Sequence, residues 1–348
     1  MSPFILTVLL FALGLGTTIT FASSHWLLAW MGLEINTLAM LPLMCQCHHP
    51  RAVEATTKYF LIQATAAAML LFASTTNAWM TGQWSLELMN NSFSSTLVIM
   101  ALALKIGLAP LHGWMPEVLQ GLDLTTGLIL STWQKLAPFC LLLQINPSNT
   151  SLLLVLGLAS TLVGGWGGLN QNQLRKILAY SSIAHLGWMI LVMQFFPPLT
   201  LMTLLLYFVM TFSLFILFKI NYATNINSLA LSWSKAPITS SMLPLILLSL
   251  GGLPPLSGFM PKWLILQELT KQDLTPLAIL AALSALLSLY FYLRIAHAMT
   301  LTMTPNILLS ILPWRMPSHQ HTLPLALTTS MTICLLPLTP PAIALLTL

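Results

Sequence analysis

Residues 95–120 read STLVIMALALKIGLAPLHGWMPEVLQ, and this stretch decides the class of fold. A helix needs about 20 mainly apolar residues to cross the hydrocarbon core of a bilayer, so the stretch is long enough to span. It nevertheless contains the charged residue Lys105, followed by the helix breakers Gly107 and Pro110. A charge near the middle of a bilayer costs at least about 2.5 kcal/mol. The stretch therefore predicts a membrane helix that is interrupted beside a charged side chain.

The composition extends this prediction to the whole chain. Of the 348 residues, 57% are hydrophobic and only 5% are Asp, Glu, Lys or Arg, whereas an ordinary soluble domain has about 25% charged residues. So few charges could not keep a water-exposed surface of this size in solution, which excludes a soluble enzyme and a disordered chain. The net charge of +5 is not gathered into a basic face, which excludes a nucleic-acid partner.

Eleven apolar runs have the length of spanning helices, and short connections join them. None shows the period-2 alternation of a β-barrel strand. The first run has no Lys or Arg before it and is longer than the apolar core of a signal peptide, so we expect it to be retained. The predicted fold is all-α, a single polytopic membrane domain of residues 1–348 with about eleven helices. The runs are 3–21, 25–44, 57–80, 95–120, 124–145, 150–169, 174–195, 199–220, 238–267, 275–300 and 322–346.

The Lys and Arg residues in the connections and near the ends of the runs are divided unequally between the two sides of the membrane. If every run crosses once, the side opposite the N-terminus holds only Lys271. Loops rich in Lys and Arg stay on the inner side, so the N-terminus is predicted inside and the C-terminus outside. The cations on the N-terminal side are Arg51, Lys58, Arg175, Lys176, Lys219, Lys235, Arg294 and Arg315.

Two loop patterns carry weaker hypotheses. Residues 45–49 (CQCHH) have the residue types of a metal site but lack the usual two-residue gap between paired thiolates, so a solvated loop is favoured and no metal is predicted. Asn90 and Asn149 begin glycosylation acceptor motifs on the outer side, which matter only if the chain passes through a secretory pathway.

Four charged residues are assigned to membrane depth, where a charge is costly: Glu34, Lys105, Lys135 and Lys262. Such residues usually face a bundle interior or a water-filled path, so they are candidates for function. The alternative is that the lysines extend to the membrane surface, which would suit Lys262 but hardly the other two.

Lys105 and Lys262 each lie beside a group of helix breakers, and the two groups of breakers are about 145 residues apart. Because proline lacks a backbone donor, we expect discontinuous helices at both places. Non-helical backbone at membrane depth is buried in protein or lines a wet cavity, and paired breaks in two halves of a transporter mark its ion path. The spacing suggests an internal repeat, although the residue-by-residue similarity looks weak, and kinks for packing remain an alternative. The breakers are Gly107 and Pro110 in the first stretch and Gly251, Gly252, Pro254, Pro255 and Gly258 in the second.

A buried lysine is suited to a switchable proton site. Burial disfavours the charged ammonium, whereas a nearby carboxylate favours it, so a Glu34–Lys105 pair could hold or release a proton as the partners approach or separate. The other two lysines could accept the proton and pass it on. His185 and His112 are candidate relays because imidazole titrates near pH 6.5 in water, although either could equally be a hydrogen-bonded core residue.

No other motif in the sequence indicates a nucleotide or redox site that could supply energy for transport. Residues 164–168 (GGWGG) end an apolar run with no strand before them, so close helix packing is favoured over a dinucleotide loop. The sequence contains no phosphate-binding loop and no Cys or His set suited to haem or iron–sulfur ligation. Active transport by this chain would depend on a gradient or a partner.

The chain resembles the antiporter-like subunits of the membrane arm of NADH:ubiquinone oxidoreductase (respiratory complex I), a family related to Mrp-type cation/proton antiporters. The resemblance covers essentially all of the chain and is closest to a short, eleven-helix animal form. It is carried by WMGLEINTLAMLPLM around Glu34, LKIGLAPLHGWMPEVLQG around Lys105, STWQKLAPF around Lys135, RKILAYSSIAHLGWM around His185 and LSLGGLPPLSGFMPKW around Lys262.

The resemblance implies two inverted five-helix repeats, each containing a discontinuous helix. It places the family's glutamate–lysine pair on Glu34 and Lys105, its central lysine on Lys135 and its exit-side lysine on Lys262. It also implies the mitochondrial inner membrane, with the N-terminus in the matrix and the C-terminus in the intermembrane space.

The implied function is to couple NADH:ubiquinone electron transfer to proton translocation along a polar axis in mid-membrane. The implied partners are antiporter-like neighbours and accessory subunits of the membrane arm, and lipids such as cardiolipin. No cofactor is expected in this chain, because NAD, FMN, iron–sulfur clusters and ubiquinone would be bound elsewhere in the complex. The alternatives are a non-conducting structural subunit and a free-standing cation/proton antiporter.

Overall fold

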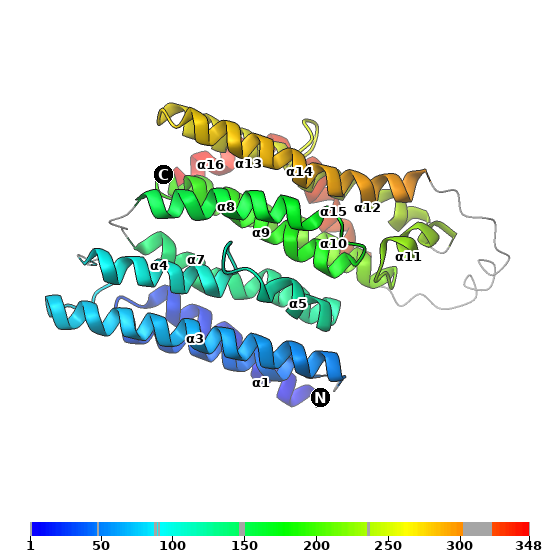
Figure 1. Ribbon diagram of the computed structural model, residues 1–348. Helices are drawn as coiled ribbons and strands as arrows, with labels where there is room; N and C mark the ends of the chain where they lie inside the picture. Colours follow the sequence, from blue (N-terminus) through cyan, green and yellow to red (C-terminus); the bar gives the residue numbers. More distant parts are fainter. Residues whose placement is uncertain are drawn as a thin grey trace. The chain divides into compact units, whose positions relative to one another are not determined.

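The computed structural model describes residues 2–46, 49–86, 89, 91–145, 150–234, 237–301 and 322–347. Throughout these ranges the regular structure is helical, which confirms the all-α prediction (Figure 1). The chain divides into two compact units, Met1–Ala159 and Ser160–Leu348. Several residues used in the predictions above lie outside the described ranges: Cys47, His48, Asn90, Asn149, Lys235 and Arg315.

In the first unit, α1 packs along α2, and α3 packs along α4 and α5 (Figure 1). Glycine brings α1 and α2 close together, since a Cβ on Gly16 would lie 2.8 Å from the carbonyl oxygen of Gly32. The helices are α1 (Pro3–Ala22), α2 (Trp26–Met44), α3 (Pro50–Thr81), α4 (Ser92–Ile106), α5 (Trp114–Gly121), α6 (Leu124–Ser131) and α7 (Trp133–Gln144), and α8 (Thr150–Gly168) continues into the second unit.

In the second unit, α12 packs along α14, and α10 packs along α12 and α15. Two short 3-10 helices, Leu231–Ser234 and Leu336–Leu338, join longer elements. The α-helices are α9 (Leu174–Val192), α10 (Pro197–Ile220), α11 (Ile226–Ala230), α12 (Pro237–Gly251), α13 (Phe259–Lys271), α14 (Thr275–Thr300), α15 (Thr322–Cys334) and α16 (Thr339–Thr347).

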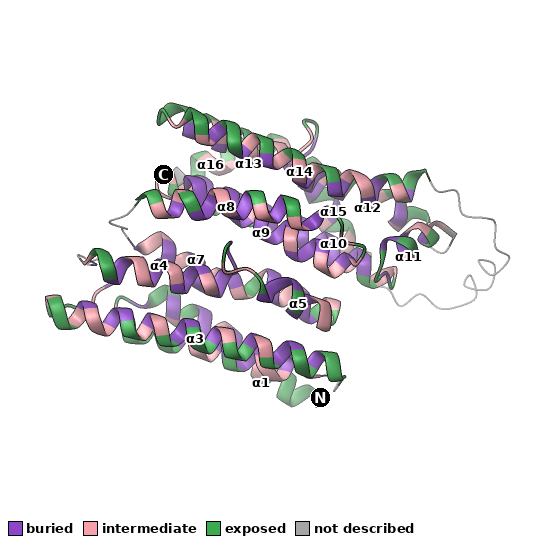
Figure 2. Ribbon diagram, in the orientation of Figure 1, coloured by how far each residue is buried: buried purple, intermediate pink, exposed green. Residues whose placement is uncertain are grey.

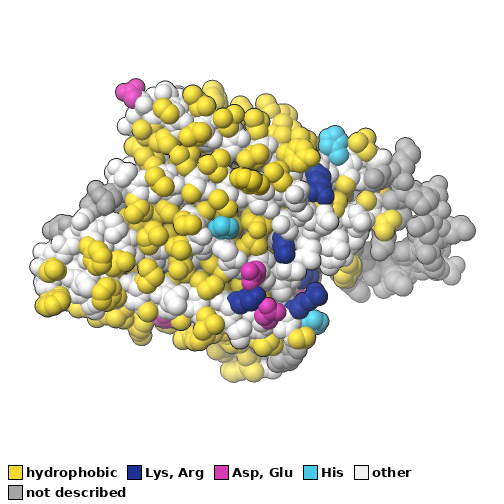
Figure 3. Space-filling model, in the orientation of Figure 1, with side chains coloured by type: hydrophobic (Ala, Val, Ile, Leu, Met, Phe, Trp, Pro, Cys, Tyr) yellow, Lys and Arg dark blue, Asp and Glu magenta, His cyan; other side chains and the backbone are white. Residues whose placement is uncertain are grey.

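The surface and helix lengths are those of a polytopic membrane protein. Among the described residues, seven helical stretches are long and apolar enough to cross a bilayer, with α6 and α7 counted as one, or eight if α15 and α16, which meet at 69°, form one bent span. Large apolar side chains cover much of the visible surface (Figure 3), and Trp79 and Trp166 are 86% and 76% exposed. Exposed and buried positions alternate along the long helices, as expected for helices between protein and lipid (Figure 2).

Three helix boundaries differ from the predicted runs. Helix α3 begins at Pro50 rather than near residue 57, because the His49 side chain accepts a hydrogen bond from the amide of Arg51 and caps a polar first turn. The run 124–145 is interrupted at Thr132, between α6 and α7. The last run bends at the 3-10 helix containing Pro337.

Many hydroxyl side chains inside the spans donate to carbonyls of their own helix. Thr17 donates to the carbonyl of Gly14, Thr20 to that of Thr17, and Ser23 to that of Thr20, at 2.7–2.9 Å. Such bonds to a preceding turn are usual for Ser and Thr in helices, and they let a threonine-rich span avoid exposing polar groups to lipid.

Candidate functional site

The first predicted break is present between α4 and α5. Helix α4 ends at Ile106, and Gly107 has φ +86°, a conformation that glycine adopts without strain. Two side chains donate to carbonyls at the end of α4: the indole Nε1 of Trp114 to Leu104 at 3.1 Å, and the amide of Gln63 to Lys105 at 3.4 Å. Carbonyls freed at a helix end need such partners when no water reaches them.

The second predicted break is present between α12 and α13, and here a lysine holds the carbonyls. Gly252 has φ +83°, and the Nζ of Lys262 donates to the carbonyls of Gly251 at 2.8 Å and Leu250 at 3.3 Å. The ammonium therefore lies at the negative end of the α12 dipole. A Cβ on Gly252 would lie 2.9 Å from Cδ of Lys262, so glycine also makes room for the side chain.

The sequences of the two breaks are more similar to each other than the weak residue-by-residue similarity stated above implies. Residues 107–116 read GLAPLHGWMP and residues 252–261 read GLPPLSGFMP, identical at seven of ten positions. In this register Lys262 corresponds to Glu117, not to Lys105. Lys105 lies in the last turn before its break, and Lys262 in the first turn after its break.

Lys135 also lies beside an interruption, which the sequence did not predict. It occupies the first turn of α7, directly after the discontinuity at Thr132, and its amide donates to the Thr132 carbonyl at 3.2 Å. Each of the three intramembrane lysines is thus within one turn of a helix end.

Lys105 and Lys135 line one internal cavity of about 20 Å³. Both side chains are buried, at 7% and 3% exposure. The cavity has room for about one water molecule. Its other polar lining residues are Asn36, Thr37, Tyr59, Gln63 and Gln134.

Several polar atoms at this cavity have no hydrogen-bond partner among the described residues: Nζ of Lys105 and both side-chain polar atoms of Asn36, which is 2% exposed. Buried polar groups are nearly always hydrogen-bonded to protein or to ordered water. This cavity, lined by Lys105 and Lys135, is therefore suited to binding water. We call it the lysine chamber.

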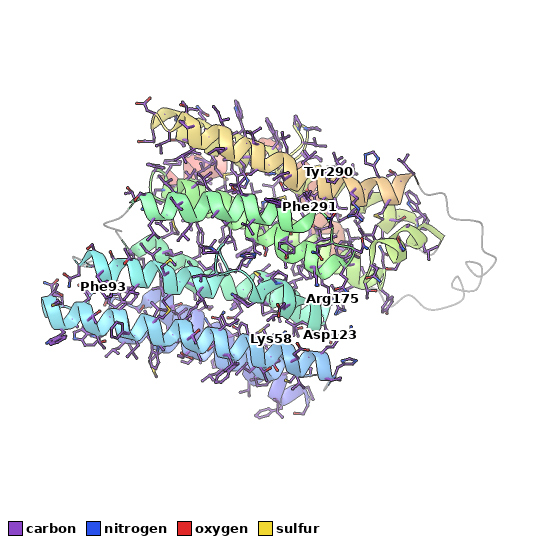
Figure 4. The ribbon with its side chains drawn as sticks, viewed as in Figure 1. Lys58, Phe93, Asp123, Arg175, Tyr290 and Phe291 are labelled. Carbon is purple, nitrogen blue, oxygen red and sulfur yellow. The ribbon has the colours of Figure 1, made fainter. Side chains whose placement is uncertain are left out.

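Glu34 lies on α2, partly buried, and accepts a hydrogen bond from the Thr37 hydroxyl at 3.1 Å. Glu34 and Lys105 do not form an ion pair within 4 Å in the described structure. The ion pairs within 4 Å among the described residues of the whole chain are Lys58 with Glu54 (2.7 Å) and with Glu117 (2.8 Å), and Lys271 with Glu268 (2.6 Å). Lys58, labelled in Figure 4, thereby joins α3 to α5.

In the second unit, Lys262 and His185 line a second cavity of about 20 Å³, together with Thr203 and Met210. The His185 ring also packs against Tyr207, with ring centroids 5.6 Å apart. His112 lies in the first break, partly exposed, and does not line either of these two cavities.

No group of three or more His, Cys, Asp or Glu residues in the described ranges could hold a metal ion. Cys45, from the loop with metal-site residue types, donates instead to the Thr56 hydroxyl at 3.3 Å.

Two family models together match most of the chain. One, described as NADH:quinone oxidoreductase/Mrp antiporter, matches residues 23–288, and one for the C-terminus of NADH dehydrogenase subunit 2 matches residues 289–343. Curated relatives named NADH-ubiquinone oxidoreductase chain 2 are similar over their full length. That of Tetraodon nigroviridis is 72% identical (98% of both chains), that of Gadus morhua 68% and that of Danio rerio 63% (100% of both chains).

Solved structures share the fold. A chain of respiratory complex I from Thermus thermophilus with bound aureothin is 26% identical, with a TM-score of 0.87 over 99% of this chain and 80% of that one. Chains of an archaeal membrane-bound sulfane sulfur reductase (20% identical, TM-score 0.84) and of the Mrp complex from Dietzia sp. (17%, 0.78) each match 97% of this chain and 74% of their own. At these lower identities the likeness concerns the fold alone.

Proposed function

Because this chain belongs to the NADH:quinone oxidoreductase/Mrp antiporter family of membrane proteins, we propose that it carries protons through the membrane by way of its buried lysines. It is a membrane subunit of NADH:ubiquinone oxidoreductase, respiratory complex I, as its full-length relatives are. Electron transfer elsewhere in that complex would supply the energy, since no redox site is expected in this chain.

The observation that carries the proposal is the chamber shared by Lys105 and Lys135. Both lysines are buried, and the ammonium of Lys105 has no hydrogen-bond partner in the described structure. An isolated buried charge is unfavourable, so such a lysine tends either to lose its proton or to bind water. A water between the two lysines would let the proton move from one to the other.

In the second unit, Lys262 and His185 share a cavity that would continue the path. His185 can bind or release a proton near neutral pH, and Lys262 would receive it at the end of α12. Glu34 would modulate Lys105 through its charge. We assign His112 an auxiliary role, because it lines neither of these two cavities.

The repeated break supports a finer architecture of eleven spans in two inverted five-helix repeats. In this proposal α4 with α5, α6 with α7, α12 with α13, and α15 with α16 each form one interrupted span, and α9 forms a continuous one. The N-terminus would face the matrix and the C-terminus the intermembrane space, in line with the distribution of Lys and Arg.

Lipid and subunit contacts are also part of the proposal. A groove of about 520 Å³ between α2 and α3, lined by apolar residues such as Pro42, Phe60 and Leu61, is suited to an acyl chain of a lipid such as cardiolipin. Antiporter-like and accessory subunits would cover other apolar faces. NAD, FMN, iron–sulfur clusters and ubiquinone would be bound by other chains.

Replacing Lys105 or Lys135 by methionine tests the function, because methionine keeps the side-chain length but cannot carry a proton. In the reconstituted complex, each variant should lower NADH-driven proton uptake about tenfold or more, as loss of a proton-transfer group does. Lys271→Met is the matched control, because Lys271 is exposed and paired with Glu268. Native electrophoresis establishes assembly, and normal uptake by assembled Lys105→Met and Lys135→Met complexes would favour a structural subunit instead.

A further inference from the structure

Thr37 contacts both Glu34 and the chamber of the two lysines. Its hydroxyl lies 3.1 Å from Oε2 of Glu34 and 2.9 Å from the backbone carbonyl of the same residue. Thr37 lines the cavity together with Lys105 and Lys135, whereas Glu34 does not. The hydroxyl therefore lies at the boundary between the carboxylate and the lysines.

This position matters because Glu34 and Lys105 make no ion pair within 4 Å in the described structure. A proton moving between them needs an intervening group. A hydroxyl can donate one hydrogen bond and accept others at the same time, so it can connect a carboxylate to a water. The unpartnered atoms of Asn36 and Lys105 on the same cavity favour a water at the other side of Thr37.

We propose that the Thr37 hydroxyl relays protons between Glu34 and the lysine chamber. In the relay step, the Thr37 O–H bond breaks as its proton passes to the Glu34 carboxylate. A new O–H bond forms with a proton from a cavity water that is protonated by the Lys105 ammonium. Lys105 ends neutral, Glu34 ends protonated and the threonine is unchanged.

The Thr37 hydroxyl has two possible acceptors, both on Glu34, and the choice between them can interrupt the relay. The single hydroxyl proton can be donated to the Glu34 carboxylate or to the Glu34 carbonyl, but not fully to both. When it is donated to the carbonyl, as other threonines of the spans do, the carboxylate is disconnected from the chamber. The inference rests on the proposed proton transport and adds to it the route between Glu34 and the lysines.

Thr37→Val tests the relay, because valine keeps the shape and removes the hydroxyl, and Thr37→Ser restores the hydroxyl. Thr20→Val is the matched control. Thr20, like Thr37, is buried (0% and 8% exposed), and its hydroxyl donates to the carbonyl three residues earlier, but it is not among the residues lining the chamber. In the reconstituted complex we expect NADH-driven proton uptake to fall about tenfold or more with Thr37→Val. It should remain near normal with Thr37→Ser and Thr20→Val.

A double variant separates relay from packing. In a Glu34→Gln background the carboxylate can no longer take up the proton, so adding Thr37→Val should cause no further loss, whereas a packing defect would add to it. Uptake by Thr37→Val equal to that of Thr20→Val, or a fully additive loss in the double variant, would overturn the inference. Thr37→Ala replaces Thr37→Val if the latter does not assemble.

The lysine variants show which proposal has failed. If Lys105→Met and Lys135→Met abolish uptake while Thr37→Val does not, the relay is wrong and the lysine path stands. If the lysine variants also transport normally, the proposed function itself is wrong.

Discussion

The three intramembrane lysines differ in what surrounds their ammonium groups. The Nζ of Lys262 donates to two carbonyls at the end of α12, whereas the Nζ of Lys105 has no hydrogen-bond partner in the described structure. Lys135 lines the same cavity as Lys105. Each lysine lies beside a helix end. We therefore expect that a substitution at that helix end alters proton transfer at the lysine.

Gly252→Ala should displace Lys262. The added Cβ would lie 2.9 Å from Cδ and 3.1 Å from Nζ of Lys262, and the positive φ adds backbone strain of about 1 kcal/mol. Gly82→Ala is the control, because Gly82 also has a positive φ, +74°, but nothing lies within 4 Å of its Cβ position. We expect reduced proton uptake with Gly252→Ala alone, and equal uptake by both variants would show that displacing Lys262 has no effect.

At this scale the sequence predicts the charged residues but not their partners. A lysine or glutamate inside an apolar run can be recognised from the sequence alone, because charged residues are rare in such runs. Thr37 is not visible in this way, since threonine is common in these spans and usually bonds to its own helix. Asn36 and Gln63 are polar residues inside apolar runs, and that signal could have added them to the candidates. Which of these side chains meet depends on the rotation of α2, α3 and α4 about their axes.

Among the elements, α1 and α2 pack closely through glycine near the lysine chamber. Gly16 faces Asn36 as well as Gly32, and a Cβ on Gly16 would lie 2.4 Å from Oδ1 of Asn36. Asn36 lines the lysine chamber. The position of α1 against α2 therefore also fixes a polar group of the site.

Gly16→Ala should force α1 away from α2 and shift Asn36. Overpacking of this kind typically costs about 1–3 kcal/mol. Gly14→Ala, on the same helix, places its Cβ where nothing lies within 4 Å and should be neutral or slightly stabilising, since alanine favours helix. Thermal denaturation of the purified complex, followed by native electrophoresis, should show earlier loss of the chain with Gly16→Ala only; identical profiles would contradict tight packing here.

The sequence predicts helix breaks only where glycine and proline cause them. Those at Gly107 and Gly252 are signalled by their residues, and both are present. No glycine or proline lies within four residues of the interruption at Thr132, so a search for adjacent breakers does not find it. The early start of α3 was missed because its first turns are charged, and a search for apolar runs begins only after them.

On the scale of the whole molecule, the two units contain the same broken motif with different chemistry. In the first, neutral groups of Trp114 and Gln63 satisfy the carbonyls that precede the break, and in the second a lysine does so. The sequence predicts the spacing of the two breaks. Which donors meet the freed carbonyls depends on packing and is apparent only from the structure.

Membrane orientation can be measured on the whole chain. With the N-terminus in the matrix, a cysteine at the exposed position Gln83 should react with a membrane-impermeant thiol reagent from the intermembrane side, and one at Tyr222, 88% exposed, only from the matrix side. The unsubstituted chain gives the background of its own cysteines. Labelling of Gln83→Cys only after the inner membrane is opened would reverse the proposed orientation.

The contact between Lys262 and the end of α12 has a thermodynamic consequence. The bonds to Gly251 and Leu250 are charge-assisted while the lysine is protonated and weaken when it becomes neutral. Proton occupancy and the closure of this helix end are therefore linked, and linkage is reciprocal. Any force that pulls α12 and α13 apart must lower the proton affinity of Lys262, and any loss of that proton must loosen the joint. Mechanical work that separates α12 from α13 therefore changes the proton affinity of one side chain, that of Lys262.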